Sequence, residues 1–302
     1  MLKRTLTGIV ILIVLALAVA SRLLTTWIFD IFALILIELS IFEMQSAYGL
    51  YGKKPYRIFN FLYPIIAFLC FRFAPTILHA IFIQMIALLV VFLICILLDV
   101  IEAKQFSKNV ISGKITEKTA NICISNRTFA TFQIILYPSI LLSFLFAINN
   151  MELNLGFICL IVAFAVTMFS DVFAYFFGVL IKSRKIYPLI SPKKSLAGLI
   201  GGTFGGILAS GLALWAFYYG GLLPSIITTL SPASAIILFA LIGLVGTFLA
   251  QFGDLLASII KRKVGIKDYG NVFPGHGGFM DRVDGLMFVV PFTYILVMLF
   301  IL

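Results

Sequence analysis

Long apolar runs constrain the fold of this chain more than any other feature. Residues 235–250 and 286–302 contain no Lys, Arg, Asp or Glu, and similar runs recur along the whole sequence. A helix needs about 20 apolar residues to cross a bilayer, whereas a barrel strand is shorter and alternates in polarity. With 62% hydrophobic and 11% charged residues, the 302-residue chain is expected to be a polytopic α-helical membrane protein.

The runs predict an all-α transmembrane bundle of about nine spans, forming a single integral membrane domain over residues 1–302. The spans are expected near residues 5–21, 23–45, 57–75, 77–100, 126–148, 154–178, 197–219, 234–258 and 285–302. The first run, which follows Lys3 and Arg4, also fits a cleaved signal peptide. We favour an uncleaved span, because a polytopic protein needs no separate signal.

Basic residues are distributed unevenly between the two sides of this arrangement. Twenty of the 22 Lys and Arg residues fall on one side, and only Arg22 and Arg72 fall on the other. The positive-inside rule then puts the N-terminus in the cytoplasm and the C-terminus outside, in a bacterial inner membrane. Loops beside anionic lipid account for the net charge of +10, so no nucleic-acid partner is expected.

One polar stretch, KDYGNVFPGHGGFMDRVDG at residues 267–285, interrupts the apolar runs on the predicted cytoplasmic side. It holds three aspartates, two cations, five glycines and one of the two histidines. A solvated basic loop would explain the cations alone. It explains poorly why aspartates stand at helix ends on either side of a glycine-rich turn, so residues 170–285 are expected to carry the chemistry.

Acidic residues flanking this turn are spaced to share helical faces. Asp254, Ser258 and Lys261 stand at i, i+4 and i+7, and Asp281 and Asp284 are three residues apart. Three carboxylates in a partly dry site repel one another unless a cation lies between them. Magnesium, which prefers carboxylates together with substrate phosphates, is the metal expected at Asp254, Asp281 and Asp284.

Cations interleaved with these acids predict a site for a metal-bound polyphosphate. A second basic group follows Ser191-Pro192, which reads as the start of a helix, with Ser191 as its N-cap. Topology alone also explains lysines at a cytoplasmic helix end. The residues expected to bind or orient phosphates are Lys193, Lys194, Ser195, Arg262, Lys267, His276 and Arg282.

Other acids lie within apolar runs and carry a weaker signal. Glu43 and Asp99 are expected at the cytoplasmic interface and Asp30 near the outer one. Glu38 lies deeper, and Asp171 lies in the run that ends near residue 178. An ionisable group inside a membrane is a functional candidate by default, but the sequence assigns no role to Glu38 or Asp171.

Taken together, these motifs resemble the signature of the phosphatidate cytidylyltransferases, also called CDP-diacylglycerol synthases. The similar residues are Ser258-x-x-Lys261-Arg262, Lys267-Asp268, Pro274-x-His276-Gly277-Gly278, Asp281-Arg282-x-Asp284, and upstream Ser191-Pro192-x-Lys194-Ser195 and Asp171-x-x-Ala174-Tyr175. Ala197 and residues 179–183 depart from the family pattern. The resemblance is strong over residues 170–285 and only architectural before them.

The resemblance implies a reaction in which CTP and phosphatidic acid give CDP-diacylglycerol and pyrophosphate. It implies catalytic roles for Asp254, Ser258, Lys261, Asp281 and Asp284. It also implies magnesium, with a second monovalent or divalent cation as an option, and a homodimer. Two alternatives stay open from the residues: a CTP-dependent kinase of a membrane polyprenol, and a cation or phosphate transporter. A transporter should carry its polar residues near the membrane midplane, which disfavours it.

Overall fold

The computed structural model describes residues 2–50, 54–111, 124–181, 183–188, 190–223, 226–270, 272 and 277–301. Most of this part is helical, and the prediction of an all-α fold is confirmed. Within the described residues, six helices are long and apolar enough to cross a membrane. They are Ile77–Gln105, Arg127–Asn149, Leu153–Leu180, Leu196–Tyr219, Pro232–Val264 and Met280–Ile301.

Seven helical elements make up the first half of the chain. These are α1 (Leu2–Ser21), α2 (Thr26–Leu50), α3 (Arg57–Phe73), α4 (Ile77–Ile111), α5 (Ile124–Ile134), a π-helical turn (Ile135–Ile140) and α6 (Leu141–Asn149). Helix α4 continues past its predicted end at residue 100, so part of the loop expected between the spans 77–100 and 126–148 is helical. Residues 112–123 of that loop lie outside the described residues.

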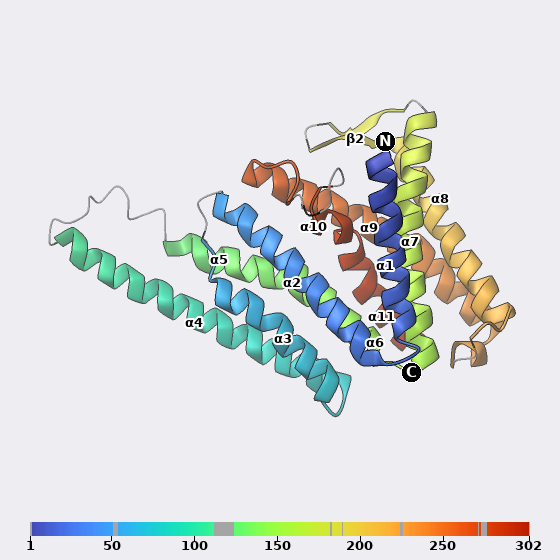
Figure 1. Ribbon diagram of the computed structural model, residues 1–302, viewed down its shortest axis with the longest axis horizontal. Coiled ribbons are helices and arrows are strands. Elements are labelled where there is room, and N and C mark those ends of the chain that lie inside the picture. Colours follow the sequence, from blue (N-terminus) through green and yellow to red (C-terminus); the bar gives the residue numbers. More distant parts are fainter. Residues whose placement is uncertain are drawn as a thin grey trace.

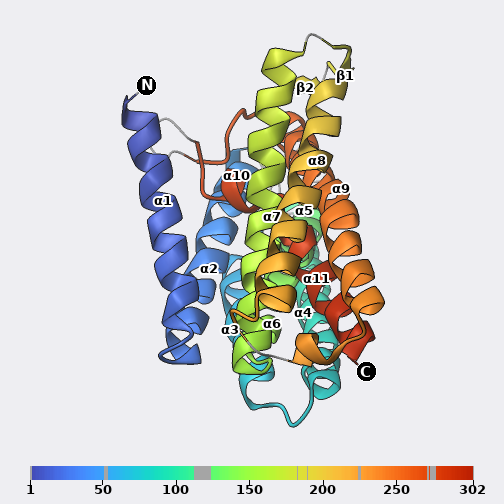
Figure 2. The ribbon, with the colours of Figure 1, turned by 90° about the vertical axis from the view of Figure 1, so that its right-hand side faces the viewer.

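The second half combines long helices with one small hairpin. Its elements are α7 (Leu153–Leu180), β1 (Lys185–Tyr187), β2 (Ser191–Ser195), α8 (Leu196–Ala213), a π-helical turn (Leu214–Tyr219), a 3₁₀ turn (Ile226–Thr229), α9 (Pro232–Val264), α10 (Met280–Val283) and α11 (Leu286–Ile301). Helix α11 packs against α6, α7 and α9 in the middle of the bundle, while α3 and α4 lie to one side (Figures 1 and 2).

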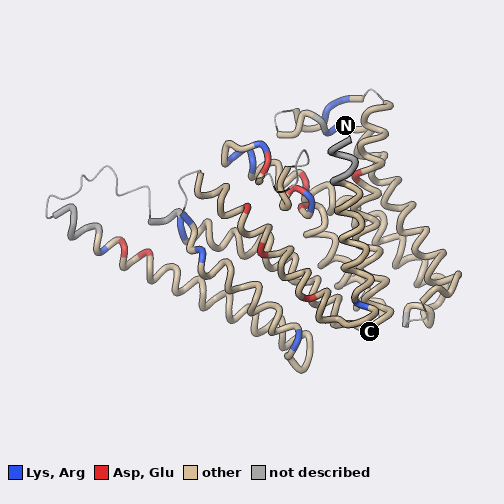
Figure 3. Tube along the Cα trace, in the orientation of Figure 1, with Lys and Arg blue, Asp and Glu red and all other residues tan. Residues whose placement is uncertain are grey.

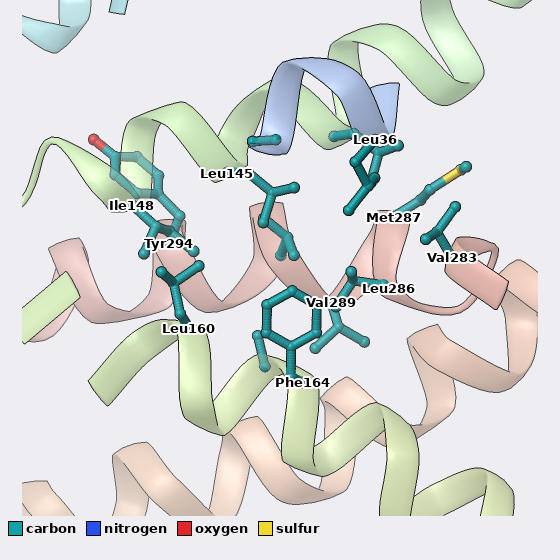
Figure 4. Close-up of a cluster of buried hydrophobic side chains, with 14 of the residues drawn as sticks. Leu36, Leu145, Ile148, Leu160, Phe164, Val283, Leu286, Met287, Val289 and Tyr294 are labelled. Carbon is teal, nitrogen blue, oxygen red and sulfur yellow. The ribbon is translucent and has the colours of Figure 1, made fainter. Parts of the chain in front are cut away.

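The apolar core lies around α11. Figure 4 shows Leu145 of α6, Leu160 and Phe164 of α7, and Leu286 and Val289 of α11 directed toward one another. The side chains of Leu145, Leu160 and Val289 are fully buried. This packing fixes the position of α11, and therefore of the short α10 that precedes it.

Glycines allow α8 to approach both of its neighbours closely. A Cβ atom on Gly201 would collide with the Phe177 side chain of α7, and one on Gly206 would collide with Thr247 of α9. The Thr247 hydroxyl donates to the Gly243 carbonyl of α9 at 2.6 Å, so that side chain is held in place. Small residues at such contacts are the usual means by which membrane helices pack without an intervening side chain.

The prediction that a helix starts at Ser191-Pro192 is wrong. Residues Ser191–Ser195 form β2, which pairs antiparallel with β1, and α8 begins at Leu196. Ser195 is the N-cap, because its hydroxyl accepts from the Gly198 backbone N–H at 3.2 Å. Ser195, and not the predicted Ser191, is therefore the serine that caps the start of this helix.

The two cations that the charge pattern separates from the rest are both structural. Arg22 is fully buried, and its guanidinium donates to the Asn149 side chain at 2.9 Å and to the Met151 carbonyl at 2.9 Å. Arg72 pairs with Asp30 at 3.6 Å and lies 4.1 Å from the Trp27 ring centre. Most other cations gather at the opposite end of the bundle (Figure 3).

Substituting Gly206 tests whether the close contact between α8 and α9 is needed. We expect Gly206→Ala to lower stability by about 1–3 kcal/mol, because the added methyl group overpacks the interface. Gly211→Ala in the same helix is the matched control, since no heavy atom lies within 4 Å of its added Cβ. Thermal unfolding in detergent measures both, and equal melting temperatures for the two variants would contradict the packing described here.

Candidate functional site

Many of the polar residues singled out from the sequence meet where α9 ends, next to the loop that follows it and to α10. Asp254, Ser258 and Lys261 lie on one face of α9, as their spacing predicts. The helix ends at Gly265, which takes the left-handed conformation with φ of 78°. Figure 3 shows acidic and basic residues close together around α10 and the end of α9.

Asp281 organises the loop. One of its carboxylate oxygens accepts from the Lys261 ammonium at 2.6 Å, and the other accepts from the backbone N–H groups of Tyr269 and Gly278, each at 3.0 Å. The Lys261–Asp281 pair is nearly excluded from solvent, with side chains 11% and 7% exposed. A metal at Asp281 would compete with these three donors, and its predicted role as a ligand stays a prediction.

A second ion pair joins the hairpin to α9. Lys194 of β2 lies 3.0 Å from Asp254 and donates to the Gln251 carbonyl at 3.0 Å. The Asp254 side chain is 43% exposed, so one carboxylate of the site is open to solvent. Lys194 therefore reaches the site from a strand rather than from the helix terminus that the sequence predicts.

A third carboxylate completes the cluster. Asp284 is buried at the end of α10, where it accepts from the Gly285 N–H at 2.8 Å. It lies within electrostatic range of Asp254, Asp171 and Lys261. Asp171 of α7 is in turn within range of Arg282 and Lys194. Asp254, Asp284 and Asp171 thus lie within electrostatic range of one another, and the sequence assigns no role to Asp171.

The donors of this cluster suit a hard divalent cation. Among the described residues, no group of three His, Cys, Asp or Glu side chains has the geometry of a complete metal site. Magnesium commonly uses only one or two carboxylates and completes its shell with water and substrate phosphates. Asp254, which is accessible, and Asp284, which is near it, supply carboxylates of that kind.

The remaining predicted phosphate ligands have mixed outcomes. Arg262 donates to the Ile190 carbonyl of the hairpin at 3.3 Å, and Lys267 is exposed on the loop after α9. The Ser195 hydroxyl is engaged in capping α8. His276 and the side chain of Lys193 lie outside the described residues.

Glu43 of α2 is a residue whose importance the sequence does not reveal. It is 3% exposed, and its two oxygens accept from the N–H groups of Phe279 at 2.9 Å and Met280 at 2.8 Å. A Cβ atom on Gly270 or Gly278 would collide with this carboxylate. Glu43 therefore holds the segment leading into α10 from a helix more than 200 residues away in sequence.

Tyr137 also reaches the site from the first half of the chain. It lies in the π-helical turn that contains Pro138, and its hydroxyl donates to the Gly253 carbonyl at 3.4 Å. The hydroxyl is within electrostatic range of Asp254, Asp281 and Asp284. A π-turn of this kind is often found at functional sites.

Tyr269 is the second phenol of the site, in the loop after α9. Burial raises the pKa of its hydroxyl above the ordinary value for tyrosine, and the neighbouring Tyr48, Asp281 and Asp284 add to this effect. The hydroxyl therefore stays protonated at neutral pH and donates to the Ala257 carbonyl at 3.4 Å. Lys261 lies 5.6 Å from the ring centre, so the aromatic face also supports the ammonium.

Comparison with protein families decides the affiliation of the chain. Residues 2–300 match the model of a family described as the cytidylyltransferase family. The chain belongs to this family. The family resemblance predicted from residues 170–285 is therefore confirmed, and the match extends into the first half, where the motifs are absent.

Curated relatives carry a more specific name. The chain is similar to the phosphatidate cytidylyltransferases of Thermotoga maritima (33% identity over 193 residues, 63% of this chain and 66% of the relative) and Aquifex aeolicus (35% over 174 residues, 57% and 58%). It is also similar to that of Staphylococcus haemolyticus (36% over 134 residues, 44% and 46%). The matched segments thus cover less than two thirds of each relative's length.

Removing the charge of Glu43 should loosen the segment before α10. In Glu43→Gln one of the two backbone N–H groups loses its acceptor, so we expect amide exchange at Phe279 and Met280 to rise about tenfold. Glu38→Gln, a like change on the same helix, is the control. Hydrogen–deuterium exchange measures both, and unchanged protection in Glu43→Gln would show that this carboxylate does not hold the segment.

Proposed function

We propose that this protein is a phosphatidate cytidylyltransferase, which converts CTP and phosphatidic acid into CDP-diacylglycerol and pyrophosphate. The observation that carries the proposal is the convergence of Asp254, Asp284, Lys194 and Lys261 at one end of an apolar helical bundle. Family membership and the names of the relatives support the same activity. An amphiphilic substrate and a soluble nucleotide can meet where membrane helices end.

We further propose that the bundle crosses a bacterial inner membrane nine times, with the active site in the cytoplasm and the C-terminus outside. Twenty of the 22 Lys and Arg residues on one side of that arrangement support this orientation. The whole chain would form one membrane domain, with residues 170–285 carrying the chemistry. Membrane lipids surround it, and family resemblance supports a homodimer.

The proposed reaction needs charge neutralisation more than proton transfer. A phosphate oxygen of the lipid attacks the α-phosphorus of CTP, a new P–O bond forms, and the bond to pyrophosphate breaks. The nucleophile is already an anion, so the residues have to bring two anions together and stabilise the charge that develops on the leaving group. Asp254 and Asp284 would hold magnesium, which screens the phosphate oxygens when bound.

The protein's own cations would bind the phosphates that the metal does not reach. Lys194 and Lys261 stand beside Asp254 and Asp281 respectively, so each ammonium is already held in the site. Asp281 would position Lys261 and the glycine-rich loop, and would become a metal ligand only by giving up one of its donors. The set proposed to orient or bind phosphates further includes Ser258, Lys193, Ser195, Arg262, Lys267, His276 and Arg282.

Substituting Asp254 tests this site. We expect Asp254→Asn to lower kcat/KM for pyrophosphate release from CTP and phosphatidic acid by at least about 100-fold, because a carboxylate for the metal is lost. Melting temperature should change little, since this side chain is 43% exposed. Glu152→Gln, at the opposite end of the bundle, is the control and should keep full activity.

The same assay, with a polyprenol offered in parallel with phosphatidic acid, separates the proposed activity from its competitor. Release of CDP with a phosphorylated polyprenol would identify a kinase and refute the cytidylyltransferase. If the Asp254→Asn variant still released pyrophosphate at the wild-type rate, the proposed activity would hold and the proposed role of Asp254 would be refuted. Magnesium chelation should abolish the wild-type reaction, and addition of magnesium should restore it.

A further inference from the structure

A second polar region lies at the end of α2, next to α3, α4 and α5. It is a cavity of about 900 Å³, lined by residues at the end of α2, the start of α3 and the facing sides of α4 and α5. Its lining residues are Gln45, Ser46, Gly49, Leu50, Lys54, Pro55, Tyr56, Arg57, Ile58, Phe59, Leu98 and Arg127. Both regions lie at the same end of the bundle, because Glu43 near the end of α2 contacts Met280.

Positive charge in this cavity is not balanced by its own lining. Lys54, Arg57 and Arg127 line it, and no Asp or Glu is among its described lining residues. Two acids that contact its lining residues are already engaged: Asp99 accepts from Tyr56 at 2.7 Å and from Thr128, and Glu102 pairs with Arg127. Lys54 and Arg57 form no ion pair within the described part of the chain, so their charges are available to an anion.

Arg127 shapes the polar side of the cavity. Its guanidinium pairs with Glu102, donates to the Lys54 carbonyl at 2.9 Å and lies 4.3 Å from the Tyr56 ring centre. These contacts fix the segment from Lys54 to Tyr56 against α5. The cations are therefore presented by an ordered wall rather than by a loose loop.

Gln45 contributes a buried polar group to the lining of the cavity. The residue is 3% exposed, and its amide nitrogen, which is closed to solvent, has no hydrogen-bond partner among the described residues.

Apolar residues make the other side of the same cavity. Leu50 and Ile58 are 80% and 77% exposed, and Phe59 and Leu98 complete the apolar lining. A free phosphate ion would use the cations and leave these side chains uncovered. A ligand with an anionic head and hydrocarbon chains uses both.

We propose that this cavity binds an anionic phospholipid from the surrounding membrane, at a site separate from the carboxylate cluster. Gln45 and Gly49 follow Glu43 by two and six residues, which places them about 200° and 240° around the helix from it. Glu43 is turned to α10, whereas Gln45 and Gly49 line the cavity from the opposite side of α2. The headgroup phosphate pairs with Lys54 and Arg57, and the acyl chains lie along Leu50 and Ile58.

Lipid binding to the full-length protein in an uncharged detergent tests the proposal. Native mass spectrometry measures the affinity for dioleoyl phosphatidylglycerol, with dioleoyl phosphatidylcholine and sn-glycerol 3-phosphate as comparison ligands. We expect Arg57→Gln, and Lys54→Gln separately, to weaken phosphatidylglycerol binding about tenfold, since each removes a charged contact to phosphate. Lys104→Gln, an exposed cation on α4, is the matched control and should bind as the wild type does.

Asp254→Asn tests whether the lipid site is independent of the proposed reaction. We expect this variant to bind phosphatidylglycerol with the wild-type affinity. If Arg57→Gln and Lys104→Gln weakened phosphatidylglycerol binding equally, the effect would come from general surface charge, and the proposal would be overturned. If phosphatidylcholine bound as tightly as phosphatidylglycerol, the site would not require an anionic headgroup, and the proposal would be overturned. Glycerol 3-phosphate binding as tightly as the lipid would overturn the role of the acyl chains.

Discussion

The ion pair between Lys261 and Asp281 joins the end of α9 to the short helix α10, and the geometry of the candidate site depends on it. Because the pair is nearly excluded from solvent, breaking it would leave an uncompensated charge in a dry environment. The Asp281 carboxylate also accepts from the Tyr269 and Gly278 N–H groups, so described residues at both ends of the stretch between α9 and α10 are held by one side chain. Lys261 is held beside the carboxylates for the same reason.

Close packing of the long helices holds the elements on either side of this loop in place. Helix α8 approaches α7 and α9 closely through its glycines, and α11 is enclosed by α6, α7 and α9. Polar groups that extend from these helix ends are therefore carried on elements with little freedom to move apart. The proposed reaction, which joins two anionic substrates, would benefit from such preorganisation, because the protein's charges would not have to rearrange.

Much of the fold and part of the site follow from local sequence patterns. Apolar run length predicts the helices, and helical periodicity predicts the shared face of Asp254 and Lys261, because both depend only on residues near one another. Glu43 and Tyr137 could not be found in this way, since their roles come from contacts between distant elements. Ser195 shows a different limit: two serines four residues apart both fit an N-cap, and only the tertiary structure selects the second.

Glu43 also limits how far the chain could be shortened around the stretch that carries the motifs. Residues 170–285 contain every motif of the family signature, yet the backbone that leads into α10 is held by a carboxylate from α2. A fragment that begins after α6 would retain those motifs without this anchor and without the Tyr137 hydroxyl. The half of the chain that carries the motifs therefore depends on the first half for the position of α10.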